Sequence, residues 1–318
     1  EYERKAKRTE EDRNDHRRKY PFSIKEAFTS AYKSCHFSLE KINAQEERFI
    51  YGNPYKLVQG NFVWENSIRD SKVIFQPQEN GKFLVSYLLP QEQSNAQDLL
   101  NGKRIPTNVM KGGAGCDPYK FSTHAQSSDP SLGAGYIWWH YDESIDGQLP
   151  DDEQVTDNFI VEYINRPKSR EIFNEDMLMM CVYYGIKINI EVNVEHTMNY
   201  FIDRGYEGYL LFGRFAKKEG RKLVIREKDK AGQYSTGDKV KDPMFAHFEW
   251  YVENKISHCK FPRLLEQIRE VEYDDTRKYD AFMGAGYCLL GIKMINKKPS
   301  IKKDGYSSPL SVHQAAEF

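Results

Sequence analysis

The sequence predicts an α/β protein in which helices flank a mixed central β-sheet. Three observations lead to this prediction. Apolar residues alternate at strand spacing in three successive segments, a helical segment rich in Met and Leu follows them, and a β-branched strand comes after that helix. A strand–helix–strand order after a three-stranded meander is typical of mixed sheets covered by helices.

The region before this pattern carries its own signals. A capping box followed by an apolar helical stripe predicts a helix at residues 23–35. Apolar residues alternate at 73–75 and again at 83–87, with Asn80-Gly81 between them, and this arrangement predicts a β-hairpin. The polar residues 91–105 are expected to form a connector.

The meander is expected to begin near residue 107. Its three strands are predicted at about 107–117, at 135–141 and at 159–164, where alternating or continuous apolar residues end at turn residues. A helix is predicted at 169–184, because apolar residues recur at helical spacing and Gly185 provides a C-terminal stop.

The elements after this helix complete the predicted topology. Ile and Val alternate strictly over 186–194, which predicts a strand with its β-branched residues on one face. A short helix at 195–204 and a strand at 209–212 should follow, and two helices at 243–271 and 275–290 should end the ordered part. This order of elements fits an RNase H-like unit.

We therefore expect three regions in the chain. Residues 1–104 would form a helical and hairpin linker region, residues 105–292 the main α/β domain, and residues 293–318 a flexible basic tail. The first residue is not Met, and it lies within a charged helical pattern. This beginning suggests a fragment of a longer protein.

Composition excludes several classes of protein. Hydrophobic residues make up 39% of the chain, which is enough for a sizeable core, yet no run of about 18 apolar residues could cross a membrane. A net charge of −1 gives no global attraction to nucleic acid, so a polyanion would need a local basic patch. The five widely spaced cysteines argue against a disulfide framework or a zinc knuckle. The P-loop, serine hydrolase and zinc protease motifs are absent.

Three acids at the ends of predicted elements are candidates for chemistry. Asp117 ends the first strand, Glu191 lies on the polar face of the β-branched strand, and Asp280 lies in the first turns of the last helix. Two divalent cations about 4 Å apart can hydrolyse a phosphodiester, and Mg²⁺ prefers carboxylate ligands. Taken singly, each acid also has an ordinary explanation as a turn residue, an exposed strand residue or a first-turn helix acid.

At these residues the sequence resembles a known family, over about residues 20–292. It is similar to the C-terminal part of the large terminase subunit of tailed bacteriophages, which packages and cuts viral DNA. The matching segments are PFSIKEAF at 21–28, the alternating region at 73–90, GCDP at 115–118, NIEVN at 189–193 followed by Gly205-Tyr206, and YDAFMGAGYCLL at 279–290.

The resemblance implies an RNase H-like (RuvC-type) nuclease that binds two Mg²⁺ or Mn²⁺ ions. Asp117 would bridge the two ions, and Glu191 and Asp280 would be further ligands and catalytic acids. Asp129, in the loop after the first strand, would be an additional ligand. Relatives often carry a double acid at the last motif, so Asp275 is an alternative to Asp280.

The resemblance also implies biological partners. The substrate would be double-stranded DNA, cut from concatemers during genome packaging, and the partners would be the portal protein and the small terminase subunit. The location would be the host cytoplasm, with no membrane association. The ATPase motor of the family is missing from this chain.

A basic segment is the candidate DNA contact. Residues 214–230 hold eight Lys and Arg against three acids, and Glu219-Gly220-Arg221 suggests a hairpin turn. The Lys and Arg side chains of such a hairpin, located beside an acidic site, would bind the phosphates of DNA. The candidate residues are Lys217, Lys218, Arg221, Lys222 and Arg226. A solvated hairpin without a partner is an equally good interpretation.

The leading hypothesis is a metal-dependent DNA endonuclease domain of a phage large terminase. No base-reading motif is visible, so sequence selectivity should be low. One alternative is a RuvC- or integrase-like nuclease of another system. The other is a non-catalytic module that docks DNA or the portal, in which the acids are only structural.

Overall fold

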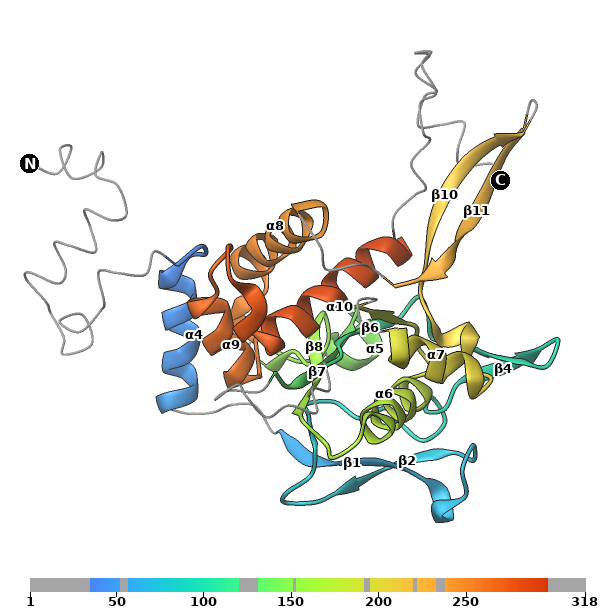
Figure 1. Ribbon diagram of the computed structural model, residues 1–318. Coiled ribbons are helices and arrows are strands. Elements are labelled where there is room, and N and C mark those ends of the chain that lie inside the picture. The colour runs from blue at the N-terminus through green and yellow to red at the C-terminus, as the bar shows by residue number, and fades with distance from the viewer. Residues whose placement is uncertain are drawn as a thin grey trace, which may run out of the picture.

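The computed structural model describes residues 35–51, 57–119, 131–150, 153–191, 195–219, 222–232 and 238–296. A seven-stranded sheet in the order β2-β1-β3-β8-β7-β6-β9 forms its centre, with helices on both faces (Figure 1). The predicted α/β class with a mixed central sheet is therefore confirmed. Its strands are β1 (Val58–Trp64), β2 (Val73–Pro77), β3 (Phe83–Val85), β6 (Gly112–Asp117), β7 (Gly133–Trp139), β8 (Asn158–Asn165) and β9 (Ile188–Ile190).

Two hydrophobic cores lie on the two faces of this sheet. One core packs α6 (Arg170–Tyr184) and α7 (Glu195–Asp203) against it. The other packs α4 (Leu39–Tyr51), α8 (Asp238–Asn254), α9 (Pro262–Glu270) and α10 (Asp280–Asn296) against the opposite face (Figure 1). The remaining helical turns are α5 (Glu143–Asp146), η1 (Glu65–Ser67), η3 (Glu207–Tyr209), η4 (Ile256–His258) and η5 (Thr276–Lys278).

Strand direction brings several strand ends to one edge of the sheet. β6 pairs antiparallel with β7, and β7 pairs antiparallel with β8. β6 and β9 are parallel, with Cys116 opposite Ile190. The C-terminal ends of β6, β8 and β9 therefore lie at the same edge of the sheet.

The hairpin predicted around Asn80-Gly81 is wrong. β2 and β3 do not pair with each other, because β1 lies between them and pairs antiparallel with both. The turn crosses the end of β1 so closely that a Cβ on Gly81 would lie 2.3 Å from the Cα of Gly60. β3 also pairs with β8, so strands from the predicted linker region 1–104 belong to the same sheet as the predicted main domain.

A different Asn-Gly pair does form a hairpin. β4 (Gln97–Leu100) and β5 (Lys103–Pro106) pair antiparallel where a polar connector was expected. Asn101 and Gly102, between them, have φ of 51° and 77°. Two positive φ angles are the signature of a type I′ turn, which Asn-Gly favours.

Helix boundaries agree with prediction where local signals are strong. α6 begins after Ser169, whose side chain accepts a hydrogen bond from the Ile172 backbone, and it ends at Gly185 with φ 64°. The helix predicted at 243–271 is instead two helices, α8 and α9, because Pro262 opens a new helix at its first position.

Other segments are shorter than predicted or lie outside the described ranges. β9 covers Ile188–Ile190 of the strand expected at 186–194, of which residues 192–194 lie outside the described ranges. In the strand expected at 209–212, Leu210 forms a bridge to Ile188 and Phe212 begins β10 (Phe212–Glu219). The last helix begins at Asp280 and runs to Asn296, into the predicted tail. The predicted helix at 23–35 lies almost wholly outside the described residues, as do residues 297–318.

One buried carboxyl group joins the sheet to α9. Glu162 on β8 is 4% exposed, and its Oε2 accepts a hydrogen bond of 2.6 Å from the Tyr136 hydroxyl on β7. The backbone of Leu264, near the start of α9, forms a further hydrogen bond to it. Burial raises the pKa of Glu162 to about 7, although these hydrogen bonds and Arg263 oppose the rise.

This raised pKa predicts a pH-dependent part of the stability. The folded state binds the Glu162 proton more tightly than the unfolded state, so its contribution is fully present below the unfolded pKa of 4.5 and is lost as pH rises to about 7. The stability difference between wild type and Glu162→Gln should therefore change by about 3 kcal/mol between pH 4 and pH 8. Urea unfolding across this pH range measures it, and a constant difference would contradict the prediction.

Close packing of α10 on β6 predicts a second effect. A Cβ on Gly115 would lie 2.0 Å from the backbone N of Cys288, where only backbone movement could make room. Gly115→Ala should reduce the free energy of unfolding by about 3 kcal/mol or more, measured by urea denaturation. Gly102→Asn is the control, because a Cβ at this position would meet no atom within 4 Å and Asn tolerates positive φ.

Candidate functional site

Two of the predicted acids are neighbours across parallel strands. Asp117 is the last residue of β6, and Glu191 directly follows β9. Cys116 lies opposite Ile190, and the Glu191 backbone N–H donates to the Cys116 carbonyl at 3.1 Å. Asp117 and Glu191 are the next pair of positions in this register. The parallel pairing thus joins two acids that are far apart in the chain.

Both acids belong to the face of the sheet that α10 covers. Gly115 faces α10, because a Cβ there would meet Cys288. Asn189 also faces α10, and its side-chain amide donates to a backbone carbonyl of that helix at 2.9 Å. Asp117 and Glu191 each lie two residues further along their strands, and side chains two residues apart share a face.

The third acid, Asp280, begins α10 and is 9% exposed. Its Oδ2 accepts a hydrogen bond of 2.9 Å from the Leu132 backbone N–H, and its Oδ1 accepts one of 3.0 Å from the Ser131 hydroxyl. Ser131 and Leu132 come just before β7. Asp280 is therefore tied to the beginning of the strand that pairs with the end of β6.

The direction of α10 brings Asp280 to the same edge as the other two acids. A Cβ on Gly284 would lie 2.8 Å from Ala134, which is the register partner of Asp117. Gly291, further along the helix, packs against Asn189. The helix thus runs antiparallel to β6 and β9, with its N-terminus at their C-terminal ends. All three predicted acids share one edge and one side of the sheet, a group named here the acidic edge.

The electrostatics of Cys116 agree with this placement. Cys116 is fully buried on β6, next to Asp117. Its pKa is raised well above the usual value, first by burial, then by Cys181, and then by the negative charges of Asp117 and Glu191. Both acids are therefore close enough to act on the same thiol, which stays protonated and unreactive.

The acidic edge has suitable ligands for a hard cation but does not form a complete ligand group. Carboxylate oxygens are what Mg²⁺ and Mn²⁺ prefer. Among the residues that the structure describes, however, no three His, Cys, Asp or Glu side chains are arranged to hold a metal ion. Both oxygens of Asp280 already accept hydrogen bonds from the protein. Asp117 and Glu191 are the pair best placed to begin a cation site.

Of the two other predicted ligands, the structure describes only Asp275. Asp129 lies outside the described residues. Asp275 precedes η5, where its carboxylate accepts a hydrogen bond of 2.9 Å from Arg277 and pairs with Lys278 at 3.5 Å. The pKa of Asp275 is lowered, and the hydrogen bond from Arg277 is the largest cause. Asp275 is thus engaged by cations of its own turn, and Asp280 is the acid at the sheet edge.

The residues that hold Asp280 were not predicted from the sequence. The Arg166 guanidinium donates to the Ser131 carbonyl and lies over the Tyr119 ring, with its Cζ 4.8 Å from the ring centroid. Arg166 thereby fixes the segment whose hydroxyl and N–H bind Asp280. No local pattern marks this arrangement, because its members come from four separate parts of the chain.

The predicted basic hairpin is present. β10 (Phe212–Glu219) pairs antiparallel with β11 (Lys222–Ala231), and it projects from the body of the molecule (Figure 1). In its register Lys217 is opposite Val224 and Lys218 is opposite Leu223. Lys222 and Arg226 lie on β11, opposite Glu219 and Phe215, whereas Arg221 lies outside the described residues.

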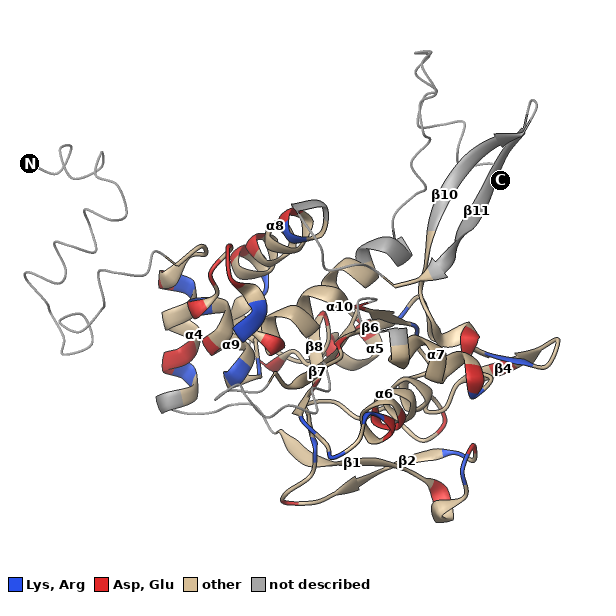
Figure 2. Cartoon of the chain, viewed as in Figure 1, with Lys and Arg blue, Asp and Glu red and all other residues tan. Residues whose placement is uncertain are grey.

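The surface charge of the described residues is mixed. Figure 2 shows positions of Lys and Arg beside positions of Asp and Glu along both α4 and α8. No helix within the described ranges is long and apolar enough to cross a membrane.

No family model and no curated protein matches the sequence.

The hydrogen bonds to Asp280 predict a stability effect. Ser131→Ala removes the hydroxyl that donates to Oδ1 of this buried carboxylate and should reduce the free energy of unfolding by about 1–2 kcal/mol. Ser94→Ala is the matched control, because its hydroxyl donates to the exposed Gln91 carbonyl and accepts a 3.2 Å hydrogen bond from the Asn95 amide but contacts no buried carboxylate, so its loss should cost less than about 0.5 kcal/mol. Urea unfolding measures both variants, and equal losses of stability in the two would contradict the role given to Ser131.

Proposed function

We propose that this chain is a metal-dependent DNA endonuclease domain of the kind found in phage large terminases. The observation that carries the proposal is the acidic edge, where Asp117, Glu191 and Asp280 come from three separate elements to one side of the sheet. The resemblance assigned these same three residues to the metal site. Their common location is expected for a nuclease and is not needed for three unrelated surface acids.

The topology supports the finer assignment to an RNase H-like fold. β6, β7 and β8 form an antiparallel meander, α6 follows them, and β9 then pairs parallel with β6 on its free side. Beyond β9, Leu210 forms a parallel bridge to Ile188, in the place of a further strand. This order, β8-β7-β6-β9, is the one expected of an RNase H-like unit. The strands β3, β1 and β2 extend the sheet on the other side.

The residues of the acidic edge would act by binding and orientation. Bound Mg²⁺ or Mn²⁺ would stabilise the negative charge that develops on a phosphodiester during hydrolysis. Asp117 and Glu191 would hold such ions, and Asp280 would contribute from the helix. Ser131 and Leu132 keep the Asp280 carboxylate turned toward the sheet edge. The substrate would be double-stranded DNA, and the setting would be genome packaging in the host cytoplasm, with the portal protein and small terminase subunit as partners.

A docking module is the second candidate function, and one observation favours it. Both carboxylate oxygens of Asp280 accept hydrogen bonds from Ser131 and Leu132, as expected of an acid with a structural role. A chain that binds DNA or the portal without cutting would need its acids only for such contacts. A RuvC- or integrase-like nuclease of another system remains the alternative within the same fold, and it would differ in its preference for branched DNA.

Cleavage of plasmid DNA tests the proposal. We expect the purified chain with Mn²⁺ to nick or linearise a supercoiled plasmid, and Asp117→Ala to reduce the rate about 100-fold or more, because it removes a metal ligand at the centre of the edge. Asp98→Ala, an exposed acid on β4, is the matched control and should cut at the wild-type rate.

The remaining outcomes separate the alternatives. Binding without cutting by the wild type would support the docking module. Faster cutting of four-way junctions than of linear duplex would support the resolvase-like nuclease. Metal-dependent cutting that survives in Asp117→Ala would refute the assignment of the acidic edge.

A further inference from the structure

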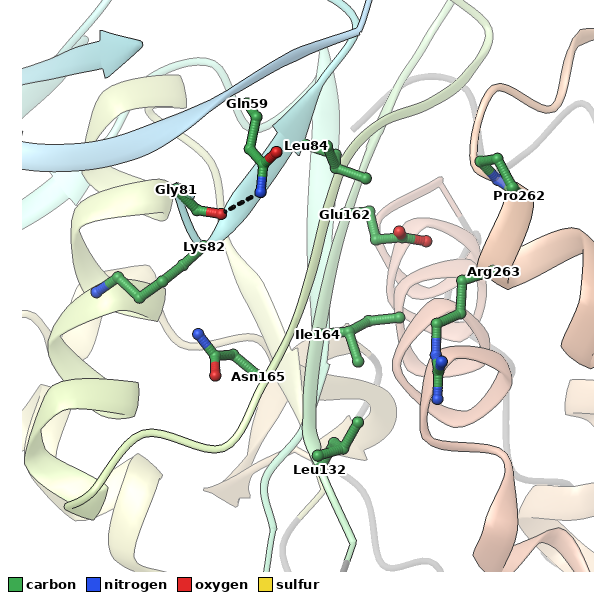
Figure 3. Close-up of a pocket in the computed structure, with 10 residues that line it drawn as sticks. All are labelled: Gln59, Gly81, Lys82, Leu84, Leu132, Glu162, Ile164, Asn165, Pro262 and Arg263. Atoms are coloured by element: carbon green, nitrogen blue, oxygen red, sulfur yellow. Dashed lines mark hydrogen bonds between the residues drawn. The ribbon is translucent and has the colours of Figure 1, made fainter. Parts of the chain in front are cut away.

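A pocket of about 470 Å³ lies beside the acidic edge (Figure 3). β3 and β8 form its floor with the apolar side chains of Leu84 and Ile164, and the first residues of α9 form one wall. Its volume is within the range of about 300–1,000 Å³ that is typical of small-ligand sites. The pocket is on the α10 side of the sheet, because Leu84 and Ile164 pack against the same hydrophobic core as α10.

The pocket and the acidic edge share a residue. The side chain of Leu132 lines the pocket, and its backbone N–H is the donor to Asp280. The C-terminal end of β8, with Asn165, lies at the same sheet edge as the end of β6. A strand of DNA whose phosphodiester lay at the acidic edge would therefore have this pocket next to it.

Arg263 and Asn165 are the lining residues that offer hydrogen-bond donors, whereas the Gln59 side chain already donates to the Gly81 carbonyl at 2.7 Å (Figure 3). Arg263 is exposed at the second position of α9, and within the described ranges the structure gives its guanidinium no hydrogen bond or ion pair. Figure 3 shows its side chain extended along the pocket, on the far side of Ile164. Asn165 Oδ1 accepts from the Arg166 backbone N–H at 2.7 Å, which leaves the Asn165 amide group as a donor.

Lys82 and Glu162 are the two other charged groups of the pocket, and Figure 3 shows the Glu162 carboxyl group directed toward Arg263, whose positive charge opposes the rise in its pKa that burial causes. Lys82 forms an ion pair with Asp176 on α6, and Figure 3 shows its side chain pointing away from Arg263. Glu162 is buried and bonded to Tyr136, so little of its carboxyl group is accessible. The charge offered to a ligand is thus that of Arg263, and the matching ligand has an anionic acceptor group and an apolar part.

We propose that this pocket binds one nucleotide of the DNA strand next to the phosphodiester at the acidic edge. Arg263 and Asn165 would hold its phosphate, and its sugar and base would lie on Leu84 and Ile164. This inference rests on the proposed function for the identity of the ligand as DNA. A cation at this place also offsets the repulsion between the phosphate backbone and the three acids.

DNA binding measured without cleavage tests the pocket. Fluorescence anisotropy with a labelled single strand and the corresponding duplex, in EDTA and over a range of salt, compares wild type with Arg263→Gln. Loss of a charged hydrogen bond should weaken binding about tenfold at low salt. Loss of one phosphate contact should also reduce the slope of log affinity against log salt by about 0.7 for the single strand and 0.9 for the duplex.

Matched variants make the result decisive. Arg69→Gln removes the same charge from a side chain that is 67% exposed beyond the opposite end of β1, and it should leave affinity and slope unchanged. Arg263→Lys keeps the charge and should retain most of the salt slope. Equal effects of Arg263→Gln and Arg69→Gln on DNA binding would contradict the proposed nucleotide site. Weaker binding by Arg263→Gln with an unchanged salt slope would also contradict it.

The two proposals fail in different ways. If Asp117→Ala loses metal-dependent cutting while Arg263→Gln binds DNA like the wild type, the proposed nucleotide site is wrong and the proposed endonuclease function is supported. If Arg263→Gln weakens binding but the wild type never cuts, the nuclease is wrong and the pocket remains a nucleotide site. Absence of DNA binding by the wild type would overturn both.

Discussion

The close approach of α10 to β6 is the constraint on which the rest of the structure depends. Gly115 on β6 leaves no room for a side chain against Cys288 of α10. On the helix, Gly284 lies close to Ala134 of β7, and Gly291 lies equally close to Asn189 of β9. Two backbones can meet this closely only where glycine removes the Cβ. The contact fixes the helix axis along the strand, and the helix N-terminus with Asp280 must then lie where β6 ends at Asp117.

Around this contact the sheet separates two kinds of surface. The α6 face is covered by a continuous apolar core, whereas the α10 face changes from core to polar groups at one edge. The acidic edge and the nucleotide pocket are neighbours on that face, joined at Leu132. The acidic edge could bind cations, and the pocket offers hydrogen-bond donors. A DNA strand that carries cations on its phosphates could therefore contact both sites at once.

The acidic edge also has an internal conflict. Asp280 and Glu191 are both buried, and burial increases the electrostatic cost of a charged carboxylate. Hydrogen bonds from Ser131 and Leu132 compensate Asp280, and Arg166 holds those donors in place. These same bonds keep the carboxylate engaged with the protein. Ligands such as cations must therefore compete with, or add to, contacts that already stabilise the fold.

Neighbouring residues alone were enough to predict the α/β class, the limits of α6 at Ser169 and Gly185, and Asp117 as the end of β6, whereas the last helix was expected from residue 275 and begins at Asp280. Tertiary structure decided the rest. Asn101-Gly102 makes a hairpin while Asn80-Gly81 does not, since β1 takes the pairing that the second turn would have closed. The joining of the acids and the donors around Asp280 likewise follow from parallel pairing and helix packing between distant segments, for which local propensity carries no information.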